Sequence, residues 1–158
     1  MRNKHWVGVG ASIFLGIIFT VAGLGKLFYQ TETVEFFVFS EYLPAALARV
    51  VYIWLPRLEI LVGLMLISGV AARFVAAVAS GLIAGFIASN SWLLSQGLGE
   101  EPCGCFGMAE RIAQLKLTTM GALYLDVVML AFGITVLVCY QSNFFELSPW
   151  FLRRAKNG

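Results

Sequence analysis

Four long runs of apolar residues dominate the chain. They cover residues 7–29, 50–70, 74–94 and 118–140. A bilayer core of about 30 Å needs roughly 20 apolar residues as helix, and a helix satisfies its backbone amides within its own segment. The pattern therefore predicts an all-α membrane protein, in which a bundle of four transmembrane helices forms one domain over residues 1–158.

The first apolar run also has some features of a signal peptide. Arg2 and Lys4 give it a basic start. However, it is longer than the apolar region of a signal peptide, and no clear cleavage site with small residues follows it. We therefore expect it to be retained as the first transmembrane helix.

Lysine and arginine residues predict the orientation of the bundle. Cytoplasmic loops are enriched in these residues. One side of the predicted bundle carries Arg2, Lys4, Arg73, Arg153, Arg154 and Lys156. The other side carries several glutamates together with Arg49, Arg111 and Lys116. We therefore expect both chain ends in the cytoplasm and the segment between the third and fourth helices on the outer face.

Two segments outside the spans are rich in aromatic residues. Residues 35–48 contain three phenylalanines and Tyr42, and residues 144–154 combine aromatics with Arg153 and Arg154. We expect both to be interfacial helices, the first on the outer surface and the second on the inner surface beside anionic lipid. Binding to a partner protein is the alternative.

Composition narrows the range of functions. The chain is 59% hydrophobic and 13% charged, whereas soluble domains are about 45–50% apolar and about 25% charged. Lipid must therefore contact much of the surface. The net charge of +2 suggests no nucleic-acid partner. Because His5 is the only histidine, we expect neither an ordinary zinc site nor a haem with two histidine ligands.

The segment between the third and fourth spans contains the motif Pro102-Cys103-Gly104-Cys105. Thiols in an oxidising compartment do not normally stay reduced, and Gly104 permits the turn that a disulfide between such close cysteines requires. So small a ring should be strained, which would raise its reduction potential and favour thiol–disulfide exchange. An inert structural disulfide, or half of a metal site completed by a partner, are the alternatives.

Cys139 is the third cysteine, and it stands apart from the other two. It lies at the far end of the fourth span, roughly 30 Å from the outer face at 1.5 Å per residue. We expect it to be a small buried apolar residue.

Four ionisable residues interrupt the spans: Lys26, Arg57, Glu59 and Asp126. A charge at the centre of a membrane helix costs at least about 2.5–3.5 kcal/mol, so these side chains should face inward and pair. We expect Glu59 to pair with Lys26 and Asp126 with Arg57, although the partners could be exchanged. Such pairs could lock the fold. Alternatively, they could line a polar pocket that binds a quinone cofactor or relays protons, together with Asn90, Trp92, Tyr52 and Trp54.

Small residues recur at four-residue spacing in two spans. They are Ser12, Gly16 and Thr20 in the first span and Ala77, Gly81, Gly85 and Ser89 in the third. Small residues let membrane helices approach closely. Packing within one bundle is the favoured interpretation, and dimerisation is the alternative.

Pro56 leaves two interpretations of the second span open. Proline inside a helix produces a kink, whereas proline is well tolerated in the first helical turn. Either the helix is kinked at Pro56, or it begins there and residues 50–55 form a separate lead-in.

Three motifs together resemble the DoxX-like superfamily of small membrane proteins, and within it the MauE branch. They are Ala22-Gly23-Leu24-Gly25-Lys26-Leu27, Pro56-Arg57-Leu58-Glu59, and Pro102-Cys103-Gly104-Cys105-Phe106-Gly107. The resemblance implies a bacterial inner-membrane protein linked to thiol–disulfide chemistry. It also implies that Cys103 and Cys105 are the redox pair, and that Lys26 and Glu59 are the characteristic intramembrane polar residues.

The motifs and the resemblance support two functional hypotheses. In the first, the protein is a thiol–disulfide oxidoreductase of the inner membrane. Cys103 and Cys105 would be its catalytic residues, and it would exchange with a periplasmic thioredoxin-like partner and pass electrons to or from quinone. This activity would support the maturation of periplasmic proteins such as methylamine dehydrogenase. In the second, the chain is a non-catalytic accessory subunit of a larger membrane electron-transfer complex.

Overall fold

The computed structural model describes residues 2–28, 45–97 and 118–140. These ranges contain four helices: α1 (Arg2–Phe28), α3 (Ala45–Ser68), α4 (Ala72–Ser95) and α6 (Thr119–Cys139). The all-α class is therefore confirmed for the described residues. The predicted interfacial segment 144–154, and most of the segment 35–48, lie outside them.

Three of these helices are long and apolar enough to cross a membrane: Trp6–Phe28, Ala72–Ser95 and Thr119–Cys139. They support a multi-pass membrane protein. α3 is not among them. The predicted second span (residues 50–70), and with it the count of four, stays a prediction, as does the predicted orientation.

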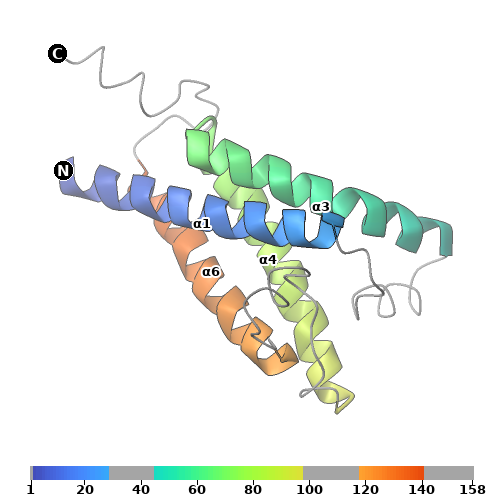
Figure 1. Ribbon diagram of the computed structural model, residues 1–158. Helices are drawn as coiled ribbons and strands as arrows, with labels where there is room; N and C mark the ends of the chain where they lie inside the picture. Colours follow the sequence, from blue (N-terminus) through green and yellow to red (C-terminus); the bar gives the residue numbers. More distant parts are fainter. Residues whose placement is uncertain (1, 29–44, 98–117, 141–158) are drawn as a thin grey trace.

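The helices form two antiparallel pairs. α1 packs most extensively on α3, and α4 packs on α6. α1 also contacts α6, whereas α3 and α4 contact each other less than these three pairs do, although a short turn joins them. Figure 1 shows the two pairs meeting near the N-terminus and diverging away from it. We call the meeting region the Gly69 end, and the region where α1 finishes the Phe28 end.

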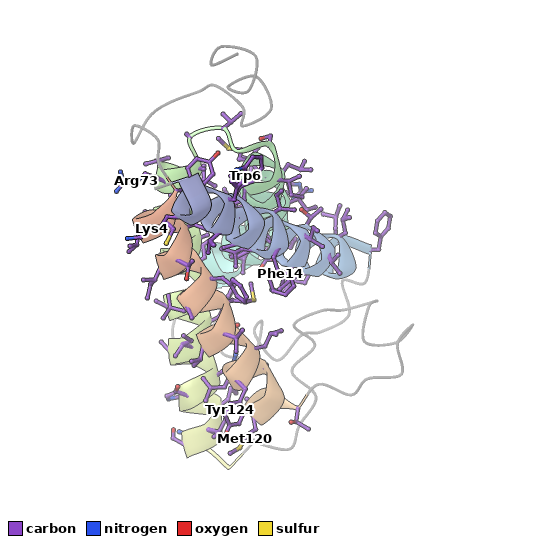
Figure 2. The ribbon with its side chains drawn as sticks, turned by 90° about the vertical axis from the view of Figure 1, so that its left-hand side faces the viewer. Lys4, Trp6, Phe14, Arg73, Met120 and Tyr124 are labelled. Atoms are coloured by element: carbon purple, nitrogen blue, oxygen red, sulfur yellow. The ribbon has the colours of Figure 1, made fainter. Side chains whose placement is uncertain are left out.

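Figure 2 shows what the two ends carry. The labelled Lys4, Trp6 and Arg73 lie at the Gly69 end, and Met120 and Tyr124 lie at the opposite end of α6. The two basic residues thus share one end of the molecule, as the predicted orientation requires.

Glycines allow α1 and α3 to approach closely. A Cβ atom built on Gly16 would lie 2.7 Å from the Gly63 carbonyl oxygen, and one on Gly63 would lie 2.7 Å from the Gly16 carbonyl oxygen. Ser12 Oγ donates a hydrogen bond of 2.7 Å to the Leu66 carbonyl oxygen, and Thr20 lies against Gly63. The small residues of the first span therefore pack within the bundle, which confirms the favoured interpretation for them.

The small residues of α4 behave differently. Gly81 and Gly85 are exposed, and a Cβ atom on either would meet nothing within 4 Å. Packing within the bundle through these two glycines is therefore a wrong prediction. Small residues occupy more than one face of α4, and it is the buried face with Ala76 and Ala79 that packs. The close contact with α6 is made by Ser80, whose Oγ would lie 2.5 Å from a Cβ on Gly133.

Pro56 lies inside α3, which extends on both sides of it from Ala45 to Ser68. The alternative in which Pro56 begins the helix is therefore wrong. Glu59 consequently lies in the helix interior, away from any helix N-terminus, and its charge must be stabilised by a side chain instead.

The turn between α3 and α4 is tight and well connected. Gly69 has a φ of 72° and Ala71 a φ of 47°, and the Gly69 amide donates to the Met65 carbonyl oxygen at 3.0 Å. A residue with positive φ directly after a helix is a common C-terminal cap, and glycine adopts it without steric cost. The buried Tyr140 hydroxyl donates to the Gly69 carbonyl oxygen at 3.5 Å, which connects this turn to the end of α6.

Candidate functional site: two buried polar pairs

Lys26 of α1 and Glu59 of α3 form a buried ion pair. Lys26 Nζ lies 2.8 Å from Glu59 Oε1, and the two side chains are 8% and 1% exposed. Helical side chains lean toward the N-terminus of their own helix. In an antiparallel pair, Lys26 therefore leans toward the Gly69 end and Glu59 toward the Phe28 end, which brings them together. This predicted pair is confirmed.

Gly23 makes room for this ion pair. A Cβ atom at Gly23 would lie 3.0 Å from Glu59 Cβ and 2.8 Å from the Pro56 carbonyl oxygen. The absence of a side chain at this position lets α1 and α3 approach one turn from Lys26. The first-helix motif of the chain thus supplies both the cation and the space beside its partner.

Asn90 of α4 and Asp126 of α6 form a second buried pair. Asn90 Nδ2 donates to Asp126 Oδ2 at 2.8 Å. The residues are 4% and 9% exposed. A buried carboxyl group needs hydrogen-bond donors, and the amide of Asn90 provides one without adding charge.

Phe86 connects the two pairs. Lys26 Nζ lies 4.8 Å from the centroid of the Phe86 ring, a distance at which a cation is attracted to the face of the ring. Phe86 and Asn90 are four residues apart on α4 and so share one face of the helix. We call Lys26, Glu59, Phe86, Asn90 and Asp126 the polar cluster.

The polar cluster combines groups of different chemistry. The ammonium and the amide donate hydrogen bonds, and the two carboxyl groups accept hydrogen bonds and can carry protons. Such a set can hold the two helix pairs in register, or it can bind a carbonyl compound and exchange protons with it.

Arg57 does not join the polar cluster. Its side chain is exposed on α3, and its Nη1 donates to the Ile53 carbonyl oxygen of the preceding turn. The predicted pair of Asp126 with Arg57 is therefore wrong. Arg57 is only two residues from Glu59, or about 200° around the helix. When Glu59 faces α1, Arg57 must consequently face away from the bundle.

The other residues that were predicted to line the polar pocket differ in burial. Asn90 is buried in the polar cluster, Trp92 is half-buried and Trp54 is exposed. The side chain of Tyr52 lies outside the described part of the chain. Phe86 was missed because an aromatic residue in an apolar helix is ordinary. Its spacing of four from Asn90 is the signal that could have identified it.

The cysteine motif lies outside the described residues, so no geometry is assigned to Cys103 or Cys105. The helices before and after it are described. α4 ends at Ser95 and α6 begins at Thr119, so the motif lies in the segment that connects the two helix ends farthest from the Gly69 end. Asp126 lies seven residues into α6, or about 10 Å from its start at 1.5 Å per residue. Asp126, one member of the polar cluster, is therefore within two helical turns of the point where the cysteine segment joins α6.

Cys139 lies at the opposite end of α6. It is a free thiol and is half-buried, where the sequence predicted a buried residue. α6 runs from Thr119 to Cys139, about 30 Å at 1.5 Å per residue. This separation keeps Cys139 away from the end that carries the cysteine motif.

Comparisons with known proteins give one match. A family model described as methylamine utilisation protein MauE matches residues 4–139. The matched range includes the polar cluster, Cys103 and Cys105. Neither the comparison with curated proteins nor that with solved structures gives a match.

Proposed function

The chain belongs to the MauE family of methylamine utilisation proteins, and from this we propose that it acts as a thiol–disulfide redox protein of the bacterial inner membrane. Cys103 and Cys105 exchange disulfides on the outer face with a periplasmic thioredoxin-like partner. The exchange supports the maturation of periplasmic proteins that need disulfides. The observation that carries this proposal is the family match, because it covers both the cysteine motif and the membrane helices that hold it.

The proposed exchange transfers one disulfide at a time. A thiolate of the partner attacks the Cys103–Cys105 disulfide and forms a mixed disulfide, and the second thiolate of the partner then releases this chain as a dithiol. The partner loses two electrons and becomes oxidised, while Cys103 and Cys105 gain them. A membrane quinone is the two-electron acceptor that we propose for reoxidation.

The polar cluster supports an acceptor in the membrane. Oxidation of two thiols releases two protons, and reduction of a quinone takes up two. The donors that a quinone carbonyl requires are available from Lys26 and Asn90, and Glu59 and Asp126 carry carboxyl groups that can hold protons. These residues lie near the helix ends that the cysteine segment connects.

The redox potential of the cysteine pair tests the proposal. The full chain carrying Cys139→Ser is equilibrated in membranes with defined glutathione buffers, and free thiols are trapped with a mass tag applied from outside. Disulfide-exchange proteins have potentials of about −120 to −230 mV. A value in this range supports exchange. A pair that stays oxidised below about −300 mV acts as a structural disulfide, and thiols that can be labelled only from the cytoplasm exclude the proposal.

A second candidate function is that of a non-catalytic accessory subunit in a larger membrane electron-transfer complex. The exposed Gly81 and Gly85 favour it, because exposed glycines on a membrane helix allow close packing with another helix. Purification in mild detergent distinguishes the two functions. An accessory subunit copurifies with its partners in fixed ratio, and it keeps this association when both Cys103 and Cys105 are replaced by serine.

A further inference from the structure

Arg57 occupies an unusual position on α3. It belongs to an exposed stripe with Val50, Trp54, Leu61 and Leu64, which follow one another at spacings of three or four and so share one helix face. The four apolar members are 53–59% exposed. A cation between apolar turns that face lipid is costly, unless its side chain reaches the headgroups or an anion.

The depth of Arg57 follows from the packing of α1 and α3. Gly16 faces Gly63, and the two helices are antiparallel, so Arg57 lies at about the level of Ala22. Ala22 is six residues before Phe28, where the apolar span of α1 ends. Six residues correspond to about 9 Å along a helix. Arg57 thus starts in the outer part of the apolar layer at the Phe28 end.

The side chain of Arg57 is directed toward that end. Its guanidinium donates to the Ile53 carbonyl oxygen, and its Cζ lies 5.9 Å from the Trp54 ring centroid. Both residues precede Arg57, and α3 begins at the Phe28 end. The side chain therefore runs along the helix toward the membrane surface, as arginine does when it keeps its charge out of lipid.

We propose that Arg57 and Trp54 bind the phosphate group of a phospholipid in the leaflet at the Phe28 end. A guanidinium has five N–H donors in a planar fork and can give two of them to one phosphate. Tryptophan is enriched at the level of the headgroups. Leu61 and Leu64 continue the stripe toward the Gly69 end and provide an apolar surface for the acyl chains.

A phospholipid fits these observations better than a protein carboxylate. A carboxylate of a partner helix packed on the stripe would have to lie between the apolar side chains, where its own charge is costly. The observed direction is along the helix axis, toward the level at which every phospholipid carries its phosphate. The shared ligand chemistry is a phosphodiester, whichever headgroup is attached to it.

Phosphorus–nitrogen solid-state NMR tests the proposal directly. The full chain, with ¹⁵N-labelled guanidinium groups, is placed in vesicles of phosphatidylethanolamine and phosphatidylglycerol. Dephasing by ³¹P identifies guanidinium groups beside a phosphate. We expect the wild-type spectrum to contain a dephased signal that is missing in Arg57→Gln, beside any signals from arginines at the membrane surface that both spectra share. Arg49→Gln, altered on the same helix, should leave this signal in place.

Two further samples decide the remaining outcomes. Arg57→Lys also removes the guanidinium signal but keeps the cation, so it assigns the signal even if Arg57→Gln fails to fold. Vesicles of phosphatidylethanolamine alone show whether the phosphodiester is sufficient, and we expect the same dephasing there. The proposal is overturned if the Arg57 signal shows no dephasing by phosphorus, or if it is instead dephased by a ¹³C-labelled protein carboxyl group.

Discussion

Lys26 Nζ and Glu59 Oε1 lie 2.8 Å apart across the contact between α1 and α3, with both side chains more than nine-tenths buried. Each charge is therefore stabilised mainly by the other. Removal of one leaves the remaining charge in an apolar environment, whereas removal of both leaves apolar surface against apolar surface.

Single substitutions of this pair should therefore destabilise the protein more than the double substitution does. We expect Lys26→Met or Glu59→Met to lower the free energy of unfolding by about 3–5 kcal/mol, and the double variant to recover most of the loss. Unfolding in lipid bicelles measures these changes. Lys4→Met, at an exposed position, is the matched control and should change little. Additive losses in the double variant would contradict a direct pair.

Glycine-to-alanine substitutions test the helix packing. Gly63→Ala places a Cβ atom against the backbone of α1, and we expect it to cost about 1–3 kcal/mol, as overpacking does. Gly85→Ala meets nothing within 4 Å and should be neutral or stabilise the helix by up to about 1 kcal/mol. Thermal unfolding of the two variants, measured in the same detergent, provides the comparison. Equal effects would mean that α1 and α3 do not approach at Gly63.

Asp126→Asn separates a scaffold role of Asp126 from a proton-carrying role. The amide oxygen that replaces the carboxylate can still accept from Asn90, so we expect a stability change of at most about 1–2 kcal/mol, the range of membrane hydrogen bonds. If Asp126 carries protons, reoxidation of Cys103 and Cys105 should slow severalfold in the same variant. Stopped thiol-trapping time courses in membranes follow this rate. An unchanged rate would restrict Asp126 to a structural role.

Cys139 should not affect the redox chemistry of the Cys103–Cys105 pair. Cys139→Ser is expected to leave the redox potential of the Cys103–Cys105 pair unchanged, since about 30 Å separates Cys139 from the start of α6. Cys103→Ser and Cys105→Ser should each abolish disulfide exchange. Mass-tag titrations of the three variants check this. A shift of the potential in Cys139→Ser would require the two ends to come together.

The helices and the ion pair were predictable because strong physical constraints act on them. Long apolar runs can only be helices in lipid, and the described helix bounds lie within two residues of the predicted ones, except at the starts of α1 and α3, which lie five residues earlier. Lys26 and Glu59 were predictable because buried charges need opposite partners at similar depth.

The second pair was not predictable by the same reasoning. Matching charges by their depth in the membrane paired Asp126 with Arg57. However, a carboxyl group also accepts a hydrogen bond from an amide, and the amide of Asn90 lies beside Asp126. The 200° between Arg57 and Glu59 showed that both cannot face the same helix. Without the positions of the neighbouring helices, this angle did not show whether Arg57 or Glu59 faces outward. The same lack of rotational information led to the wrong prediction for Gly81 and Gly85.

The antiparallel pairing of α1 with α3 has a consequence for biosynthesis. Both members of the Lys26–Glu59 pair lie within the first 68 residues, which end with α3. The nascent chain can therefore neutralise its buried cation and anion as soon as this first hairpin leaves the ribosome, before the second hairpin has emerged. The second hairpin brings Asn90 and Asp126 together in the same way. Insertion into the membrane can thus proceed in two steps, and neither step leaves the buried charge of Lys26, Glu59 or Asp126 waiting for a helix of a later step.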